Sequence, residues 1–357
     1  MYETAITTQK LNSKDPDGEV MFLLGNANAP FAVWDEKKIG KPTPKKAVKK
    51  PPKKKAKLDS AKEYIRIQVS AKHLMLASPV LKKTLSGGWK ESEIFAKKGS
   101  IDLVVEDWDL DAFLLFLRIL HCQHHDLPSS VTLEMLAKIA VMADYYACKN
   151  TVAFFANLWI EKLEPAFPTE YSRDLMLWLF VSCFFDKREL FAKSASIAMT
   201  KCNAPITNLG LPIPINVLSK SFSDVLASSF IDILYQDRIN IDREWYIQHV
   251  MKRLKEQRDL YLSKDWSCSL DCCSMLLGAL EKQMHLNGLS LPGPQPPFYG
   301  ISYETLVTAV HSFTIPRWAP ISDLTGRYNT EHYCEETRRG YNLLEFKTVC
   351  ESLLRNW

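Results

Sequence analysis

Alternating apolar and polar residues predict a strand at Ile65–Val69, and a helical spacing predicts a helix soon after it. In the strand, three β-branched residues alternate with polar ones, which is the period of a half-buried extended segment. The apolar residues that follow recur at helical intervals: Leu74, Leu76, Val80, Leu81 and Leu85. Pro79 suits the first turn of a helix, and Gly87 and Gly88 suit its end. We therefore expect a strand, a short link, a helix beginning near Ser78, and a glycine stop.

The same two periods predict the elements on either side of this stretch. Residues 19–24 read as a strand, residues 31–34 as a second short strand, residues 90–100 as a polar connector, and residues 101–105 as a strand. Helices are then expected at residues 111–121, 131–148, 151–163, 169–185, 187–201, 216–235, 242–263, 271–286, 303–313 and 343–354. Strands that are followed by a run of helices indicate an α+β fold.

The stretch around the first predicted helix resembles the BTB/POZ fold, in which a strand and a histidine lead into a helix that starts with a Leu-Ala-x-Ser-Pro-like motif. The matching residues include His73, Leu76, Ser78 and Pro79, which we take as defining the fold. The chain is similar to fungal BTB-domain proteins that carry a helical region after the BTB part. This resemblance implies protein–protein interaction and makes a homodimer plausible.

Proline positions and composition divide the chain into three expected parts. Residues 1–18 show no period and are predicted to be disordered. Residues 19–164 form the predicted BTB/POZ domain, because Pro165 and Pro168 mark a border. Residues 165–357 form a predicted helical C-terminal domain. Within the first domain, residues 35–60 are rich in lysine and proline and are expected to be an extended, disordered insertion.

Charge is concentrated in that insertion. Residues 37–57 hold eleven lysines and no acidic residue, so the rest of the chain carries 34 basic against 41 acidic side chains. Three interpretations of the insertion stay open: a solvated linker, a nuclear-import signal, or non-specific attraction to nucleic acid phosphates. No aromatic residues alternate with the lysines, so base stacking is not indicated. The lysines concerned are Lys45, Lys46, Lys49, Lys50, Lys53, Lys54 and Lys55.

Cysteine usage favours reduced thiols in the nucleus or cytoplasm. The nine cysteines are scattered, and the N-terminus lacks the pattern of a secretory signal. The most apolar run, residues 175–185, is too short to cross a bilayer and reads as a buried helix. A structural zinc site is one interpretation of the late Cys and His residues, and separate core or surface residues are the other. The four candidate ligands are Cys268, Cys272, His332 and Cys334.

Trp89 and Glu91 form the clearest candidate for partner binding. In BTB adaptors, a hydrophobic-x-Glu triplet after the first helices contributes to the surface that binds a cullin-type ubiquitin-ligase scaffold. The resemblance therefore implies this role for Trp89 and Glu91. The alternative is that Trp89 covers the core and that Glu91 is a solvated charge.

The sequence contains no motif that indicates catalysis. It lacks a phosphate-binding glycine loop, a nucleophile elbow and a zinc-protease motif. We therefore expect a non-enzymatic interaction module that self-associates and recruits a protein partner; the resemblance implies a role as an adaptor for ubiquitin ligation. The alternative is a nuclear transcription or chromatin cofactor whose lysine-rich segment directs import.

Overall fold

The computed structural model describes residues 18–35, 64–213, 236–263, 270–314 and 316, and it has a mixed α+β fold. The described residues fall into two compact units. The first comprises residues 18–34, 64–194 and 208–213, and the second comprises residue 35 and residues 195–207, 236–263 and 270–314. The predicted disordered N-terminus and the lysine-rich insertion lie almost wholly outside the described residues, as do the helices expected at 216–235 and 343–354.

A three-stranded sheet forms one part of the first unit. Its order is β2-β1-β3, with β1 (Val20–Gly25) antiparallel to β2 (Ile65–Val69) and parallel to β3 (Ile101–Glu106). The central strand is the most apolar one, and Val20, Phe22, Leu23 and Leu24 are all buried. The strands predicted at residues 19–24, 65–69 and 101–105 are thus confirmed.

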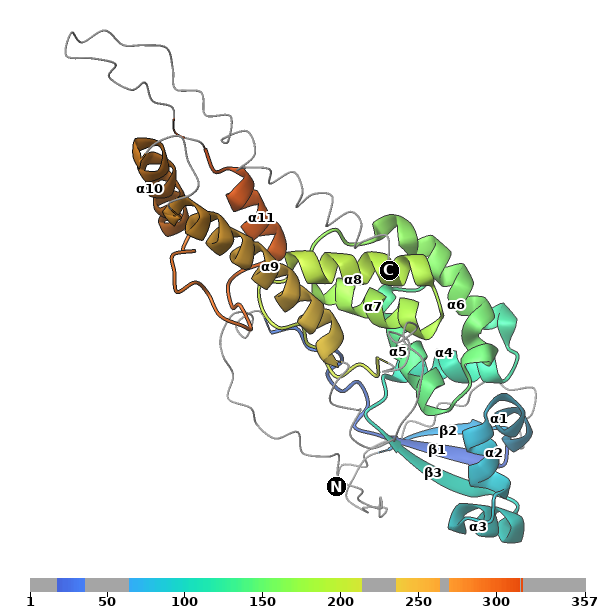
Figure 1. Ribbon diagram of the computed structural model, residues 1–357. Coiled ribbons are helices and arrows are strands. Elements are labelled where there is room, and N and C mark those ends of the chain that lie inside the picture. The colour runs from blue at the N-terminus through green and yellow to red at the C-terminus, as the bar shows by residue number, and fades with distance from the viewer. Residues whose placement is uncertain (1–17, 36–63, 214–235, 264–269, 315, 317–357) are drawn as a thin grey trace, which may run out of the picture. The chain divides into compact units, whose positions relative to one another are not determined.

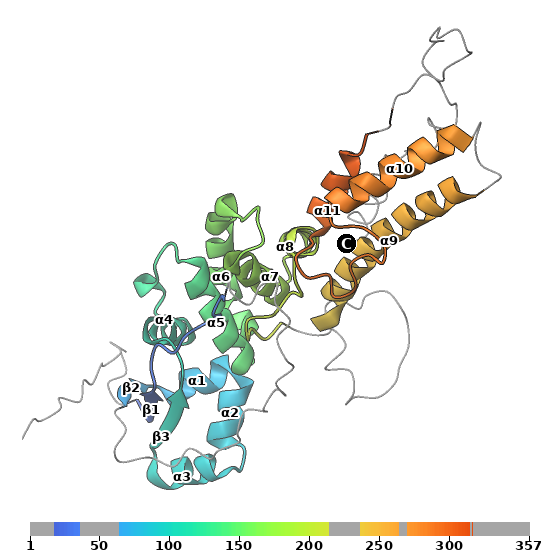
Figure 2. The same cartoon turned by 90° about the vertical axis from the view of Figure 1, so that its left-hand side faces the viewer.

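Three short helices connect β2 to β3: α1 (Ala71–Ala77), α2 (Pro79–Ser86) and α3 (Lys90–Lys98). Glu19, next to β1, accepts a hydrogen bond from the Ala71 N–H at 3.0 Å and so satisfies the start of α1. Both views show α2 and α3 beside β3 (Figures 1 and 2). The link expected between residues 70 and 78 is therefore a helix.

The prediction of a polar connector at residues 90–100 is wrong, because most of this segment forms the helix α3. Its apolar residues are few, but its charges suit a helix: Glu91 and Glu93 lie in the first turn and Lys97 and Lys98 in the last. Such charges oppose the partial charges at the two helix ends. Gly99 then ends α3 with a left-handed backbone at φ 69°.

Longer helices complete the first unit and agree with the predicted ones to within a few residues. They are α4 (Leu110–Leu120), α5 (Leu133–Tyr145), α6 (Lys149–Leu163), α7 (Arg173–Phe184) and the first half of α8 (Arg188–Lys201). Short 3-10 turns lie at His124–Asp126 and Glu164–Ala166. Every residue from Leu175 to Phe184 is buried, as the apolar run predicts. None of the described helices has the length and apolarity needed to span a membrane.

The first unit extends further than the proline pair suggests. We expected a border at residue 164, but α7 contacts α5 and the unit runs to Ser194. The prolines lie in and beside the Glu164–Ala166 turn, which redirects the chain without ending the apolar core. Phe167, next to this turn, is itself buried and stacks on Trp178 of α7.

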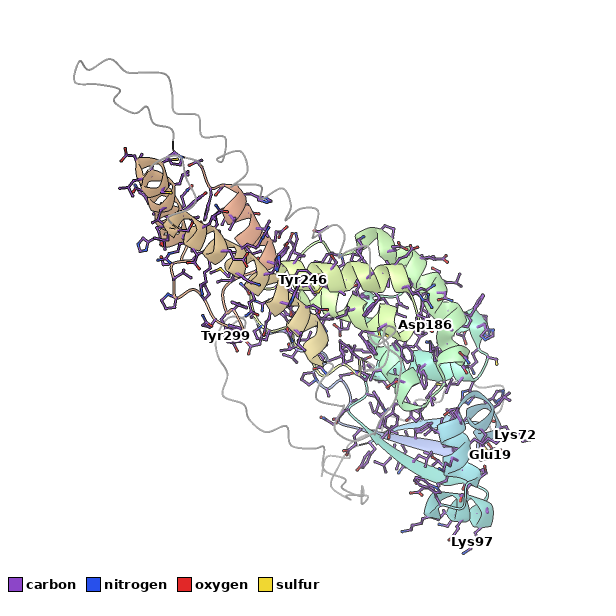
Figure 3. The ribbon with its side chains drawn as sticks, in the orientation of Figure 1. Glu19, Lys72, Lys97, Asp186, Tyr246 and Tyr299 are labelled. Atoms are coloured by element: carbon purple, nitrogen blue, oxygen red, sulfur yellow. The ribbon has the colours of Figure 1, made fainter. Side chains whose placement is uncertain are left out.

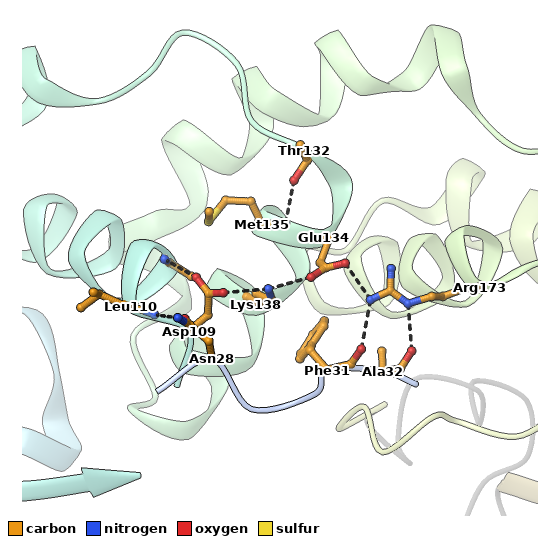
Figure 4. A network of polar contacts seen from close by, with 11 residues as sticks. Asn28, Phe31, Ala32, Asp109, Leu110, Thr132, Glu134, Met135, Lys138 and Arg173 are labelled. Carbon is orange, nitrogen blue, oxygen red and sulfur yellow. Dashed lines mark hydrogen bonds and ion pairs between the residues drawn. The ribbon is translucent and has the colours of Figure 1, made fainter. Parts of the chain in front are cut away.

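A network of ion pairs and hydrogen bonds connects α4, α5 and α7 (Figure 4). Lys138 of α5 bonds Asp109 at 2.9 Å and Glu134 at 2.6 Å. Arg173 of α7 pairs with Glu134 at 2.8 Å and donates to the carbonyls of Phe31 and Ala32. The prediction of a strand at residues 31–34 is wrong, because the carbonyls of Phe31 and Ala32 accept hydrogen bonds from Arg173 and not from a neighbouring strand.

This network predicts a loss of stability in acid. The hydrogen bond from Lys138 lowers the pKa of Glu134, and Arg173 adds to this effect. Burial alone would raise the pKa of Asp109, but the hydrogen bonds from the Ala112 N–H and Lys138 outweigh it and lower the pKa. Carboxyls with lowered pKa values in the folded state contribute stability above their unfolded pKa, and this contribution is lost as the pH falls through the folded value.

We therefore expect the melting temperature to decrease as the pH is lowered below about 4. The Glu134→Gln variant should show a smaller decrease over the same pH range. The effect is modest, up to about 1 kcal/mol, because both carboxylates are partly exposed. Thermal unfolding followed by circular dichroism between pH 7 and pH 3 measures it. The control is Glu161→Gln, which removes an exposed carboxylate of α6. Equal acid profiles for the two variants would contradict a role of the network.

The second unit packs α10 (Leu270–Leu286) and α11 (Tyr303–His311) against the long helix α9 (Gln236–Leu262). Its core includes Ile247, Val250, Cys272, Leu276 and Leu306, among others. The helices predicted at 242–263, 271–286 and 303–313 are confirmed. Ser302 caps α11, and its hydroxyl accepts from the Thr305 N–H at 3.1 Å.

Arg243 of α9 is fully buried inside this unit. Its guanidinium donates to four backbone carbonyls, at 2.8–2.9 Å, which belong to Cys202, Pro297, Phe298 and Ile301. The fixed fork of an arginine can satisfy several acceptors at once. One side chain therefore joins the helix to two separate loop segments.

Candidate functional site

Ser78 separates α1 from α2 and fixes the direction of the second helix. Its backbone is extended (φ −135°, ψ 120°), and its hydroxyl accepts from the Leu81 N–H at 3.0 Å. The same hydroxyl donates to the carbonyl of Tyr146 at 2.6 Å. Ser78 thus caps α2 and ties it to the end of α5. With Pro79 at the first helical position, it gives the predicted helix start, which is confirmed.

This break in the helix changes the prediction for Leu76. A single helical rhythm would bury it with Leu74 and Leu81, but the extended Ser78 rotates α2 away from the face of α1. Leu74 and Leu81 are buried, whereas the side chain of Leu76 is 88% exposed and that of Val80 is 38% exposed. Leu76 therefore does not help to define the core, and it leaves a large apolar side chain on the surface.

Two glycines turn the chain from α2 towards Trp89. A Cβ added to Gly87 would lie 2.3 Å from the Lys83 carbonyl oxygen, and Gly88 has a left-handed backbone at φ 77°. Larger residues would strain both positions. The predicted glycine stop is confirmed, and its effect is to set the position of the next residue.

Trp89 begins α3 with its indole on the surface, 54% exposed. Its carbonyl accepts hydrogen bonds from the Ser92 hydroxyl at 2.7 Å and the Glu93 N–H at 3.0 Å, which hold the backbone of this corner. The Lys83 ammonium lies 5.7 Å from the centre of the indole ring, a cation–π distance. The alternative in which Trp89 only covers the core does not fit this exposure.

Glu91 lies two residues after Trp89 in the first turn of α3 and is half-buried. It forms no hydrogen bond or ion pair with another described residue. Trp89 and Glu91 therefore place an exposed aromatic side chain and a nearby carboxylate on one short helix. An arrangement of this kind can contact a partner through an apolar anchor and a polar acceptor.

His73 lies on α1 against His121, with the ring centres 5.1 Å apart. His121 accepts from the Ser70 N–H through Nε2 and lies 2.8 Å from the Leu117 carbonyl through Nδ1, which fits a neutral ring that donates from Nδ1. The Nδ1 of His73 is buried without a hydrogen-bond partner among the described residues. The His73 position is thus part of the junction between β2, α1 and α4.

Of the four predicted zinc ligands, only Cys272 lies within the described residues. It is fully buried in the core between α9 and α10. Cys268, His332 and Cys334 lie outside them, as do all seven candidate lysines from Lys45 to Lys55, so both predictions stay predictions. Within the described ranges, no three His, Cys, Asp or Glu side chains gather as metal ligands would.

The buried thiols of the first unit are unsuited to nucleophilic chemistry. Burial raises the pKa of the Cys148 thiol to about 12 and that of Cys183 to about 11. A reactive cysteine needs the opposite shift, towards the thiolate.

Sequence reasoning missed two features of this surface: the exposure of Leu76 and the position of Lys83 beside Trp89. The signal for the first was present in Ser78-Pro79, because serine followed by proline favours a helix start and therefore a break. The second depends on the turn at Gly87 and Gly88, whose path the sequence does not specify.

Comparison with known proteins adds no family assignment, since no protein-family model matches this sequence and no curated protein is significantly similar to it.

Proposed function

We propose that the chain is a BTB/POZ-like interaction module without enzymatic activity, which self-associates and recruits a protein partner. The order of elements supports this proposal. The strand β2 leads into α1, which carries His73, Ser78-Pro79 starts α2, Trp89 starts α3, and β3 returns beside β1. These are the motif residues, in the same order, on which the resemblance rests.

The observation that carries the proposal is the exposed apolar surface at the junction of α1 and α2. Burying a leucine side chain stabilises an assembly by about 1.5–3 kcal/mol relative to leaving it in water. Leu76 is almost wholly exposed, and Val80, four residues later, is partly exposed. Because Ser78 holds this junction in place, the two side chains are presented by a rigid scaffold. We assign self-association to this surface.

Leu76→Asp is therefore expected to shift the chain from dimer to monomer. A charge at this position would have to be buried without a partner in the interface, which is strongly unfavourable. Mass from light scattering across a concentration series measures the shift. Leu262→Asp is the control, because Leu262 is an exposed leucine on α9. A wild-type chain that is monomeric throughout, or a dimer that persists in the Leu76 variant, would refute self-association through this surface.

Partner recruitment is assigned to Trp89 and Glu91, and a cullin-type scaffold is the partner that the resemblance implies. The exposed indole supplies the apolar anchor, and the Glu91 carboxylate supplies an acceptor at the edge of the contact. Tryptophan is among the residues that most often contribute large binding energies at interfaces. An adaptor role in ubiquitin ligation would follow from this contact.

The double variant Trp89→Ala/Glu91→Ala is expected to weaken binding to a purified cullin N-terminal domain by about tenfold or more, since hot-spot truncations cost about 2 kcal/mol. Biolayer interferometry measures the affinity. Trp245→Ala, which truncates an exposed tryptophan of α9, is the matched control. If the wild-type chain does not bind, a cullin is not the partner. If the double variant binds as tightly as the wild-type chain, Trp89 and Glu91 do not form the binding surface.

The alternative function, a nuclear cofactor with an import segment, depends on lysines outside the described residues. No described contact favours it over the interaction module.

A further inference from the structure

The helices α1, α2 and α3 carry an excess of positive charge that the chain outside residues 37–57 does not otherwise share. Residues 71–98 contain six lysines against only two glutamates, Glu91 and Glu93. Outside residues 37–57 the chain as a whole has more acidic than basic side chains. The lysines are Lys72, Lys82, Lys83, Lys90, Lys97 and Lys98. We call them the α1–α3 lysines.

All six α1–α3 lysines are exposed, and none forms an ion pair with another residue that the structure describes. Figure 3 labels Lys72 and Lys97, both on the outside of their helices. Two lysines elsewhere in the first unit do form ion pairs. Lys138 contacts Asp109 and Glu134, and Lys149 contacts Asp186 at 2.6 Å. The α1–α3 lysines therefore leave this surface positive.

Part of the positive charge lies beside an exposed aromatic side chain. Lys83 lies over the ring of Trp89, and Lys90 follows Trp89 in the chain. An apolar centre with a charged rim is the usual composition of a protein interface. Here the rim has one predominant sign, which selects partners of the opposite sign and speeds their approach.

We propose that the surface formed by Trp89 and the α1–α3 lysines binds an acidic protein segment that carries at least one apolar anchor residue. The apolar residue contacts the indole of Trp89, and carboxylates of the partner pair with Lys83 and Lys90. This inference rests on the proposed recruiting role of Trp89 and narrows it to a class of partner by charge.

The composition of the surface favours protein over nucleic acid. Glu91 and Glu93 lie in the same first turn of α3 as Trp89, and both would repel a phosphate backbone. An acidic peptide can direct its carboxylates to the lysines and keep its apolar residue over Trp89, because its charges alternate with apolar side chains.

The test uses the full chain and a random twelve-residue peptide library displayed on phage. Peptides enriched on the wild-type chain are sequenced and compared with those enriched on Trp89→Ala and on Lys83→Glu/Lys90→Glu. Lys252→Glu/Lys255→Glu is the matched control, because it reverses two exposed lysines of α9. The affinities of the best peptide and of an unrelated 20-base-pair DNA duplex are then measured by fluorescence anisotropy.

We expect enriched peptides rich in Asp and Glu around an apolar residue, with binding weakened about tenfold by the Lys83/Lys90 reversal and unchanged by the α9 reversal. Peptides that depend on Trp89 but carry no excess of acid would overturn this inference and leave the recruiting role intact. Peptides whose binding is unchanged by both the Trp89 and the Lys83/Lys90 substitutions would overturn this inference and the recruiting role of Trp89 together. If the wild-type chain binds the DNA duplex more tightly than the best peptide, and the Lys83/Lys90 variant does not bind the duplex, the surface binds nucleic acid and not an acidic protein segment.

Discussion

Replacing Arg243 with methionine is expected to lower the free energy of unfolding of the second unit by about 4 kcal/mol, a large effect for one side chain. The methionine keeps most of the apolar volume but donates no hydrogen bond. The carbonyls of Cys202, Pro297, Phe298 and Ile301 would each lose a bond from a charged donor in a buried place. A bond to a charged group contributes about 1.5–3 kcal/mol, and water entering the site would restore part of the loss.

Urea unfolding followed by circular dichroism measures the change, and hydrogen exchange locates it. The amides of residues 298–303 and of α9 should show the largest increase in exchange rate in the variant, because Arg243 holds these segments together. Arg253→Met is the control, since Arg253 lies on the same helix with an exposed side chain. Equal midpoints for the two variants would show that the four contacts contribute little.

Ser78→Ala is expected to destabilise the first unit by about 2–3 kcal/mol. Two effects add because one hydroxyl makes two contacts. The variant loses the cap of α2 at the Leu81 N–H, and it removes the donor to the buried Tyr146 carbonyl. Both contacts lie at the junction that presents Leu76, so self-association should weaken together with stability.

Thermal unfolding and light scattering on the same samples separate the two effects. Leu76→Ser is the companion variant, because its side chain is exposed and its loss should change stability by no more than about 0.5 kcal/mol. The two variants should therefore differ. Ser78→Ala lowers both stability and association, whereas Leu76→Ser lowers only association. A stable Ser78→Ala chain would mean that another donor reaches the Tyr146 carbonyl.

The sequence predicts the strands and long helices well because their signals are local. The alternation in Ile65–Val69 and the apolar run that becomes α7 each specify an element without reference to the rest of the fold. Ser78, Pro79 and Gly87 likewise mark helix ends through backbone chemistry that acts within a few residues.

The errors occur where a distant residue decides the local structure. Residues 31–34 have the composition of a strand, but Arg173, about 140 positions later, bonds the carbonyls of Phe31 and Ala32. The helix α3 depends on charge placement and a glycine cap more than on an apolar face, so a search for periodicity overlooks it. Leu76 fits the helical period and yet lies outside, because one extended residue interrupts the helix.

The candidate site divides in the same way. Trp89 and Glu91 can be selected from the sequence by their order in a known pattern, although their exposure cannot. Lys83 joins them only in the folded chain, since its ammonium reaches the indole across the turn at Gly87 and Gly88. The positive charge beside Trp89 thus depends on the path of the chain through Gly87 and Gly88.

The position of β1 at the centre of the sheet has a consequence for synthesis of the chain. The ribosome makes β1 first, but its two neighbours are Ile65–Val69 and Ile101–Glu106. At about 5–20 residues per second, the interval between the end of β1 and the end of β3 lasts roughly 4–16 s. Phe22, Leu23 and Leu24 can pair with β2 during that time but lack the complete sheet. One edge of β1 therefore stays open to nascent-chain chaperones until β3 arrives.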